Sequence, residues 1–290
     1  MKKSRKIIIF AATLISVAAI AAIIALLFFA YGDRSPGWHS YGSTVRYYVE
    51  EDGTIAKGYQ LIDGQPYYFN WRGHPHGKGW ITDSEDSSIR YYCTGGGKLL
   101  TGWTYMDRNA WYFYQKQDAG QSRRIGQAAR NYTTSGGITI GDEGCIGGEE
   151  GEALGYGMDV LNRYGWDLLS AFKYSSSLRY ADGREDYYGL RIHSCAWHGF
   201  KYGQGNCLAW ASTFCVMAKL LGYDCRLVWG TLEFRGEDVT HAWTEIWDDE
   251  GIHVYDPRKN GGKDLGGFDR RYGEKGTYKY NLEDITYLDW

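Results

Sequence analysis

One cysteine of this chain lies where a helix is expected to begin, and that position favours nucleophilic chemistry. From Cys207 to Leu221, apolar or small residues recur at steps of four and three, which predicts an amphipathic helix. Asn206 is a good N-cap and Gly222 a stop signal, so Cys207 is expected at the first helical position. There the helix dipole and free backbone N–H groups stabilise a thiolate and a developing oxyanion. The alternative is a small buried hydrophobic residue, a role that suits Cys215 better.

A histidine and an aspartate further along the chain are expected to approach this cysteine. The segments from His241 to Trp247 and from Ile252 to Asp256 flank a four-residue turn, which predicts a β-hairpin. The turn places Trp247 opposite Ile252. His241 and Asp256 are then diagonal neighbours on one face, so Asp256 can hold one imidazole nitrogen while the other faces the thiol. This is the arrangement of a nucleophile, a base and an orienting carboxylate. His253 is expected to point to the opposite face of the hairpin, so it is not a candidate.

These segments resemble the transglutaminase-like superfamily of papain-type cysteine enzymes. GQGNCLAWASTFCVMAKLLGYDCRLVWG spans residues 203–230, HAWTEIW begins at His241 and VYDP ends at Pro257, in the order of the family's motifs. The resemblance implies an α+β fold with Cys207 as nucleophile, His241 as general base and acid, and Asp256 as the orienting group. One oxyanion donor would be the Cys207 backbone N–H. The candidates for the second donor are the upstream side chains Gln204, Tyr202 and Trp197.

A second group of potential ligands lies around the start of the same helix. His193, Cys195, His198 and Cys207 are residue types that bind zinc, but their spacings of 2, 3 and 9 match no standard site. A zinc ion there would also exclude Cys207 from nucleophilic work. We therefore expect neither a metal nor another cofactor. The six cysteines are too few and too scattered for a disulfide scaffold, which leaves room for one or two bridges.

Upstream of this domain the sequence repeats. Gly followed by Trp or Tyr recurs at residues 37, 58, 79 and 102, and pairs of aromatic residues alternate with these dipeptides. Units of about 20 residues do not fold alone but stack into arrays. Turn formers such as Asp52-Gly53 and Gly95 to Gly97 predict successive β-hairpins.

These repeats resemble the choline-binding and glucan-binding cell-wall repeats of surface proteins in Gram-positive bacteria. The best matching unit is GYQLIDGQPYYFNWRGHPHGKGW, from Gly58 to Trp80. The resemblance implies a β-hairpin solenoid that binds a cell-wall polymer, either a choline-bearing teichoic acid or a glucan, through cation–π contacts or stacking. The candidate ligand-binding residues are Trp38, Tyr48, Tyr59, Tyr68, Trp80, Tyr92, Trp103 and Tyr112. The alternative is a spacer whose aromatic residues only pack against each other.

The N-terminal segment predicts an exported protein. Residues 7–30 carry no charge and are long enough to cross a bilayer as a helix. The flank before this stretch is basic and the flank directly after it is not, so everything after residue 30 should lie outside the cell. Ala30 follows two phenylalanines, which is a poor cleavage site, so an uncleaved membrane anchor is favoured over a long signal peptide.

The composition limits the remaining possibilities. An apolar fraction of 43% is enough for a packed core. The net charge is −3, and four of the 32 basic residues lie among the first six, so a nucleic acid is not expected as a partner. Residues 121–157 are rich in Gly and hold five acidic residues, which predicts a linker, with a calcium-binding loop as the alternative. A helix is predicted from Met158 to Phe172.

Together these features predict four segments and one activity. The segments are a cytoplasmic tip and anchor or signal peptide (1–36), wall-binding hairpin repeats (37–120), a linker (121–157) and a transglutaminase-like domain (158–290). Cys207 would attack an amide carbonyl of a protein or peptide to form a thioester, and His241 would protonate the departing amine. Water as second nucleophile gives a peptidase or amidase, whereas a lysine amine gives a cross-linking transglutaminase. The alternative is a catalytically idle wall-binding or structural surface protein.

Overall fold

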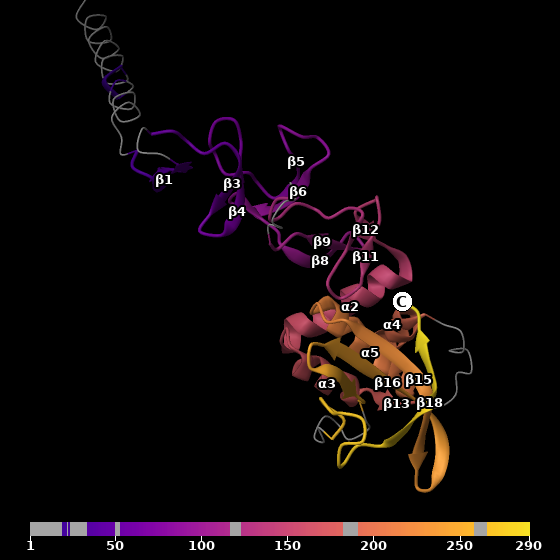
Figure 1. The fold of residues 1–290 in the computed structure, drawn as a ribbon. Coiled ribbons are helices and arrows are strands. Elements are labelled where there is room, and N and C mark those ends of the chain that lie inside the picture. Colours follow the sequence, from indigo (N-terminus) through magenta and orange to yellow (C-terminus); the bar gives the residue numbers. More distant parts are fainter. Residues whose placement is uncertain are drawn as a thin grey trace, which may run out of the picture. The chain divides into compact units, whose positions relative to one another are not determined.

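The computed structural model describes residues 19–21, 23, 34–49, 53–116, 123–181, 191–257 and 266–290 (Figure 1). The chain divides into two compact units, Met1–Ser88 with Tyr92–Leu99, and Ile89–Tyr91 with Leu100–Trp290. The predicted membrane anchor, residues 7–30, lies almost entirely outside the described residues. Among the residues that are described, none of the helices has the length and apolar character needed to cross a membrane.

The first unit is built from short antiparallel strands, as the repeats predict. Two hairpins are formed by β1 (Gly37–Tyr41) with β2 (Thr44–Tyr48), and by β3 (Gly58–Ile62) with β4 (Gln65–Phe69). The second hairpin belongs to a sheet of order β3-β4-β7-β6-β5, completed by β5 (Gly79–Thr82), β6 (Arg90–Gly95) and β7 (Lys98–Leu99).

The hairpin turns lie between the strand with the Gly-aromatic dipeptide and the strand with the aromatic pair. Gly42 and Gly64 occupy two-residue turns with φ of 63° and 77°, which is the left-handed conformation that such turns need. Gly53, which the sequence predicts in a hairpin turn, lies instead in the connection between β2 and β3. Gly96-Gly97 does form a turn, between β6 and β7.

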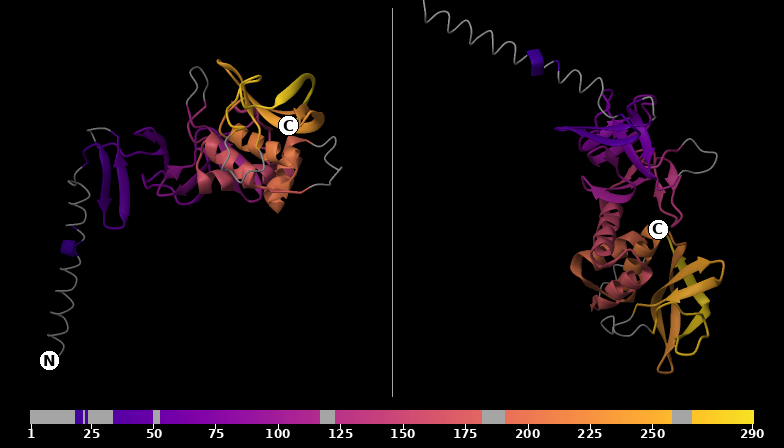
Figure 2. Two further views of the ribbon diagram at one scale, coloured as in Figure 1. Left: turned by 90° about the horizontal axis from the view of Figure 1, so that it is seen from below. Right: turned by 90° about the vertical axis from the view of Figure 1, so that its left-hand side faces the viewer.

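The second unit is an α+β domain in which helices pack on an antiparallel sheet. The sheet has the order β17 (Gly251–Tyr255), β16 (Glu237–Asp248), β15 (Cys225–Phe234), β18 (Lys279–Leu288). The helices are α2 (Gly148–Tyr164), α3 (Leu168–Ser177), α4 (Ile192–Tyr202) and α5 (Cys207–Leu220), and Figure 2 shows them on one side of the sheet. α5 packs against β15, β16 and the three other helices, and every residue of it after Cys207 is buried.

The predicted helix from Met158 to Phe172 is interrupted, so that prediction is wrong. α2 ends at Tyr164 because Gly165 adopts a φ of 130°, outside the helical region. Asp167 then caps α3, where its Oδ1 accepts a hydrogen bond from the Ser170 N–H at 2.8 Å. The apolar spacing continues across this break, so periodicity alone does not reveal it.

The predicted linker at 121–157 is also wrong. Within it, β10 (Tyr132–Thr133) pairs with β11 (Thr139–Ile140), and α2 begins at Gly148. Ile138, Ile140 and Leu154 are fully buried in the same hydrophobic core as α5. The glycines of this segment therefore permit tight turns and close packing, and they do not make it a flexible connection.

The last repeat hairpin belongs to the second unit as well. It is formed by β8 (Gly102–Met106) and β9 (Asn109–Phe113), and β12 (Cys145–Ile146) extends it into a three-stranded sheet. Ala110 of this hairpin lies in the core that also contains the residues of α2 and α5. The boundary between the units thus falls near residue 100, and the predicted boundary at 120 lies inside the second unit.

Gly136 provides a direct test of the packed segment. A Cβ at Gly136 would lie 2.1 Å from the carbonyl oxygen of Lys219, near the end of α5. We expect Gly136→Ala to lower the free energy of unfolding by about 2–3 kcal/mol, because backbone atoms must move to make room. Gly141→Ala is the matched control, since nothing lies within 4 Å of its Cβ. Urea unfolding of both variants measures the difference, and equal stabilities would contradict the packing described for this segment.

Candidate active site

Cys207 is the first residue of helix α5, as the sequence predicts. The Oδ1 atom of Asn206 caps the helix and accepts hydrogen bonds from the N–H groups of Leu208 at 3.1 Å and Ala209 at 3.4 Å. At the first helical position the Cys207 N–H has no acceptor within its own helix. Unlike the buried Cys215 further along α5, Cys207 is partly exposed, so its sulfur is accessible beside the backbone donors of the helix N-terminus.

The β16–β17 hairpin brings a histidine and an aspartate together. Its register pairs Trp247 with Ile252, which confirms the predicted turn. His241 Nε2 lies 2.9 Å from Asp256 Oδ1, and the His241 side chain is 18% exposed whereas that of Asp256 is fully buried. The Cys207 side chain also interacts with His241 and raises its pKa, so the two side chains lie near each other. Because Nε2 bonds to Asp256, Nδ1 is the ring nitrogen left to act on the sulfur.

Electrostatics favour the protonated form of His241. Burial lowers the pKa of His241, but the charge of Asp256 and the hydrogen bonds with Asp256 and Cys207 outweigh burial and raise that pKa to about 10. At neutral pH the imidazole of the free protein is therefore a cation. A positive charge beside the sulfur stabilises a thiolate nucleophile, and the same proton is available for a leaving group.

Asp256 has a second hydrogen-bond donor that the sequence pattern did not predict. The hydroxyl group of Tyr280, on β18, donates to Asp256 Oδ2 at 2.9 Å. The Tyr280 ring packs against Trp243 with its centroid 4.6 Å away, and the Trp243 ring lies nearly parallel to that of His241. Both oxygens of the buried carboxylate thus have a donor, which fixes its orientation toward His241.

A second buried carboxylate stabilises the sheet behind this site. Glu245, on β16, accepts hydrogen bonds from the hydroxyl of Tyr272, from Tyr287 at 3.1 Å and from the indole of Trp247 at 2.9 Å. Tyr272 in turn accepts a hydrogen bond from the Trp243 indole at 2.6 Å. Glu245 therefore connects β18 to the strand that carries His241, although it does not contact the Cys207, His241 and Asp256 side chains in these hydrogen bonds.

Tyr280 acts as a positioning residue, and Tyr280→Phe tests this role. We expect the rate of Cys207 alkylation by iodoacetamide at neutral pH to fall about tenfold, because the variant loses a hydrogen bond to a buried charge that orients His241. Tyr287→Phe is the matched control, since it removes a hydroxyl that bonds a buried carboxylate from the same strand. Peptide mass spectrometry measures both rates. If both variants lose reactivity equally, the hydroxyl of Tyr280 only stabilises the fold and does not position His241 through Asp256.

The three candidates for the second oxyanion donor have different surroundings. The Trp197 indole donates to Glu152 Oε2 at 2.8 Å, so its N–H is already engaged in this structure. Tyr202, at the end of α4, is 52% exposed and packs against His198. Gln204 lies in β14 (Gln204–Gly205), which leads directly into α5, and its Oε1 accepts a hydrogen bond from Arg179. The amide NH₂ group of Gln204 thus remains the best candidate donor.

The four residues considered as zinc ligands do not form a metal-binding group among the described residues. His193 packs against Trp290 with ring centroids 6.0 Å apart, and His198 packs against Tyr202. Burial raises the pKa of the Cys195 thiol to about 12, which disfavours the thiolate that zinc requires. In the parts of the chain that the structure describes, no group of three or more His, Cys, Asp or Glu side chains could hold a metal ion.

In three of the four aromatic pairs of the repeats one ring is buried, namely Tyr48, Tyr68 and Tyr91. In the first hairpin Trp38 pairs with Tyr47, with ring centroids 5.2 Å apart, and Trp38 also contacts Tyr67 of the next hairpin at 5.2 Å. Tyr48 and Tyr68 are only 4% and 5% exposed, so neither ring presents a face to a wall ligand, contrary to the prediction for these two residues. Successive side chains of a strand alternate between its faces, and the pair itself does not indicate which ring lies inside.

One pocket of the first unit collects aromatic side chains. It has a volume of about 550 Å³ and is lined by Tyr68, Trp71 and Trp80 among others. Trp71 is 73% exposed, and the Trp80 ring contacts Tyr92 with centroids 5.4 Å apart. Tyr59 lies directly across the hairpin from Tyr68. Trp71 was not predicted because it falls outside the repeating Gly-aromatic and aromatic-pair positions.

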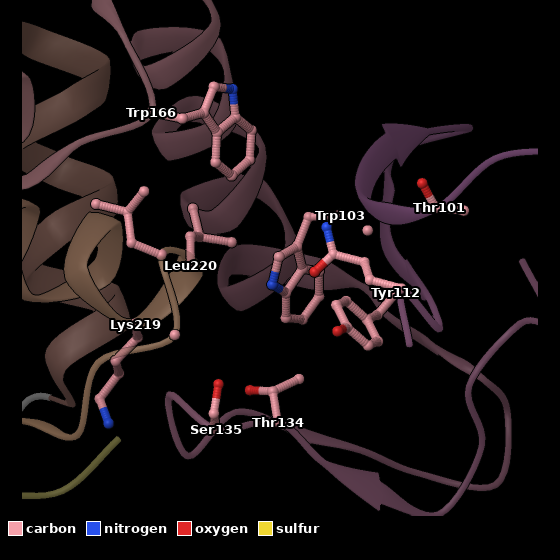
Figure 3. A pocket seen from close by; sticks show the side chains of 12 residues that line it. Thr101, Trp103, Tyr112, Thr134, Ser135, Trp166, Lys219 and Leu220 are labelled. Carbon is pink, nitrogen blue, oxygen red and sulfur yellow. The ribbon is translucent and has the colours of Figure 1, made fainter. Parts of the chain in front are cut away.

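The last hairpin contributes to a second aromatic pocket, which lies within the second unit (Figure 3). Trp103 and Tyr112 are cross-strand partners with ring centroids 5.1 Å apart. Trp166, between α2 and α3, and Leu220, at the end of α5, line the same pocket, whose volume is about 330 Å³. This pocket is therefore formed jointly by a repeat hairpin and by helices of the α+β domain.

Residues 168–257 match the family model of the transglutaminase-like superfamily. The matched segment contains α3, α4, α5 and strands β15 to β17. It also contains Cys207, His241 and Asp256. The predicted transglutaminase-like domain is thereby confirmed.

The chain is also similar to solved choline-binding proteins. Choline-binding protein F from Streptococcus pneumoniae is 25% identical with a TM-score of 0.28, and the match covers 39% of this chain and 33% of that chain. CbpJ from Streptococcus pneumoniae TIGR4 is 28% identical with a TM-score of 0.28, covering 39% and 34%. The pneumococcal cell wall endolysin from phage Cp-1, complexed with choline, is 22% identical with a TM-score of 0.23, covering 29% and 25%. The chain thus spans about a third or less of the length of these proteins. No curated protein matches the chain.

Proposed function

We propose that this protein is a cell-surface cysteine enzyme that acts on amide bonds of a protein or peptide. The observation that carries the proposal is that Cys207, at a helix N-terminus, lies near a histidine whose Nε2 is 2.9 Å from a buried aspartate. A nucleophile, a base and an orienting carboxylate in this order are the requirements of covalent acyl transfer. The match of residues 168–257 to a superfamily of such domains supports the proposal.

The proposed reaction proceeds through a thioester. The Cys207 sulfur attacks the amide carbonyl carbon, and the carbonyl oxygen receives the electron pair as an oxyanion. The Cys207 N–H and the Gln204 amide are the proposed donors to that oxyanion. When the tetrahedral intermediate collapses, the carbon–nitrogen bond breaks and His241 gives its Nδ1 proton to the departing amine. The acyl group then remains on Cys207, and His241 is neutral and ready to act as a base.

The second nucleophile decides the type of enzyme. His241 takes a proton from water or from a lysine amine, which attacks the thioester and releases Cys207. Attack by water completes a peptidase or amidase reaction, and attack by an amine completes a transglutaminase reaction. Both outcomes use Cys207, His241 and Asp256 in the same roles, and we favour hydrolysis.

The repeats are proposed to hold the enzyme at the cell wall. Trp71 and Trp80 line one pocket, and aromatic rings of this kind attract quaternary ammonium groups or stack against sugars. The ligand would be a wall polymer that carries choline or is a glucan. Residues 7–30 would anchor the chain in the membrane, with the remainder on the outer side.

The test combines product analysis with retention on walls. The full chain is incubated with purified cell walls and with casein, in the presence and absence of dansylcadaverine. New peptide termini or free ammonia without amine incorporation would show hydrolysis, whereas incorporation of the dansyl group would show transglutaminase activity. Retention on walls, and release by added choline, tests the repeats separately. Wall retention without either reaction would instead support an idle wall-binding protein.

A further inference from the structure

Two cysteines that the proposed chemistry does not use lie in contact inside the second unit. The Sγ atoms of Cys215, in the middle of α5, and Cys225, the first residue of β15, are 3.1 Å apart. Both side chains are buried. Among the described residues, which include all six cysteines, no other pair has a recorded sulfur–sulfur contact.

The surroundings of this pair favour a covalent bond over two thiols. A thiol is a weak hydrogen-bond donor, and burial raises the pKa of Cys225, so the Cys225 thiol is neither ionised nor strongly hydrogen-bonded. A disulfide needs the two sulfur atoms about 1 Å closer together, a distance that side-chain rotation and small backbone shifts can supply. Four residues, Leu221–Asp224, separate α5 from β15 at this point, so the two elements are already adjacent.

We propose that Cys215 and Cys225 form a disulfide bond in the exported protein. The inference rests on the proposed function in one respect, the location outside the membrane, where thiols become oxidised. The thiolate of one cysteine attacks an external disulfide, such as that of a thiol–disulfide oxidoreductase, and releases one thiolate of the oxidant. The second cysteine then attacks the mixed disulfide and releases the other thiolate. Two electrons and two protons pass to the oxidant, which ends as a dithiol.

Burial sets the time at which the bond forms. In the folded chain neither sulfur is accessible to an oxidant, so the exchange takes place during folding, before α5 is covered by the sheet. Once formed, the bond ties the helix that begins with Cys207 to the strand next to β16, which carries His241. Cys207 itself takes no part in the bond and stays free to react.

Peptide mapping of the exported full chain tests the bond directly. The protein is denatured in iodoacetamide without reductant and digested with trypsin, which cleaves after Lys201, Lys219 and Arg226. We expect peptides 202–219 and 220–226 to be joined, with the alkyl group on Cys207. Fragment spectra separate this product from a bridge between Cys207 and Cys225. Alkylation of both Cys215 and Cys225 in the exported protein would overturn the inference.

Thermal unfolding provides an independent measurement. The full chain, unfolded and refolded in dithiothreitol, is expected to show a Tm about 5–10 °C below that of the untreated chain, because the loop between the two cysteines is no longer closed. The double variant Cys215→Ala/Cys225→Ala should show no such response to dithiothreitol. Cys195→Ala is the matched control, since Cys195 is also buried and should leave the response intact. A wild-type Tm that does not change with dithiothreitol would contradict the bond.

These results are independent of enzymatic activity. A linked pair of peptides in a chain without amide turnover would leave this inference standing and remove the proposed function. Amide turnover by an exported chain with free Cys215 and Cys225 thiols would support the proposed function and overturn the proposed disulfide bond.

Discussion

A Cys207→Ala chain is expected to lose its amide turnover, with kcat/KM at least about 10⁴-fold below wild type. The reason is that no other group in the site can form the thioester, while His241 and Asp256 act only through the sulfur. The substitution should not disturb the fold, because Cys207 is partly exposed at the start of α5 and the Asn206 cap does not involve its side chain. Retention on cell walls should therefore be unchanged.

The matched control for this variant is Cys145→Ala. Cys145 is also a partly exposed cysteine of the second unit, but it lies in β12. Its removal should leave kcat/KM within about twofold of wild type. Product formation by both variants is followed by release of new termini or ammonia from the same substrate. Turnover by the Cys207→Ala chain would mean that the chemistry resides in other residues.

The parts of the site that the sequence predicts are those encoded by local rules. The Asn206 cap and the first position of Cys207 depend on four consecutive residues, and the structure reproduces both. The register that brings His241 near Asp256 depends on one short turn. Tyr280 was not predictable in this way, because it reaches Asp256 through the pairing of β18 with β15, whose residues are far apart in the sequence.

The structural role of each glycine is not predictable from the sequence alone. In residues 121–157 the frequency of glycine predicts a linker, yet a Cβ at Gly151 would lie 2.2 Å from the Ile146 carbonyl oxygen. This glycine therefore permits close packing at the start of α2. In the hairpin turns, by contrast, Gly42 and Gly64 adopt the positive φ that the turns require. Composition does not distinguish these uses, since both depend on which backbone lies nearby.

The structure of the repeats is also only partly predictable from the sequence. Their period correctly predicts β-hairpins, and the structure pairs Trp103 with Tyr112 across the last of them. It does not predict which ring of an aromatic pair is exposed, because that depends on how each hairpin packs against its neighbours. Tyr47 and Tyr67 contact Trp38, while Tyr48 is buried. Tertiary packing thus decides which aromatic residues can reach a ligand.

Asp256→Asn is expected to lower kcat/KM by about 10³–10⁴-fold with little change in KM. Asparagine keeps the shape of the side chain but removes the charge that supports the His241 cation. Burial then dominates, so the pKa of His241 should fall from about 10 to its ordinary value of 6.5 or below. At neutral pH the imidazole would then be neutral. No positive charge would stabilise the Cys207 thiolate, and His241 would have no extra proton to give to the leaving group. Asp269→Asn is the matched control, because Asp269 holds His253 at 2.6 Å in a pair outside the site.

The same variant should change how stability depends on pH. In wild type the folded-state pKa of His241 is raised, so the stabilisation from its pair with Asp256 is fully present below about pH 6.5 and is lost as the pH rises toward 10. In that window this group lowers the free energy of unfolding by up to about 1.4 kcal/mol per pH unit, and the Asp256→Asn chain should lack this slope. Urea unfolding of both chains across this pH range, together with the rate of Cys207 alkylation, measures the effect. Parallel stability curves and equal alkylation rates would show that Asp256 does not hold the His241 proton, because removing the charge would then leave the imidazole unchanged.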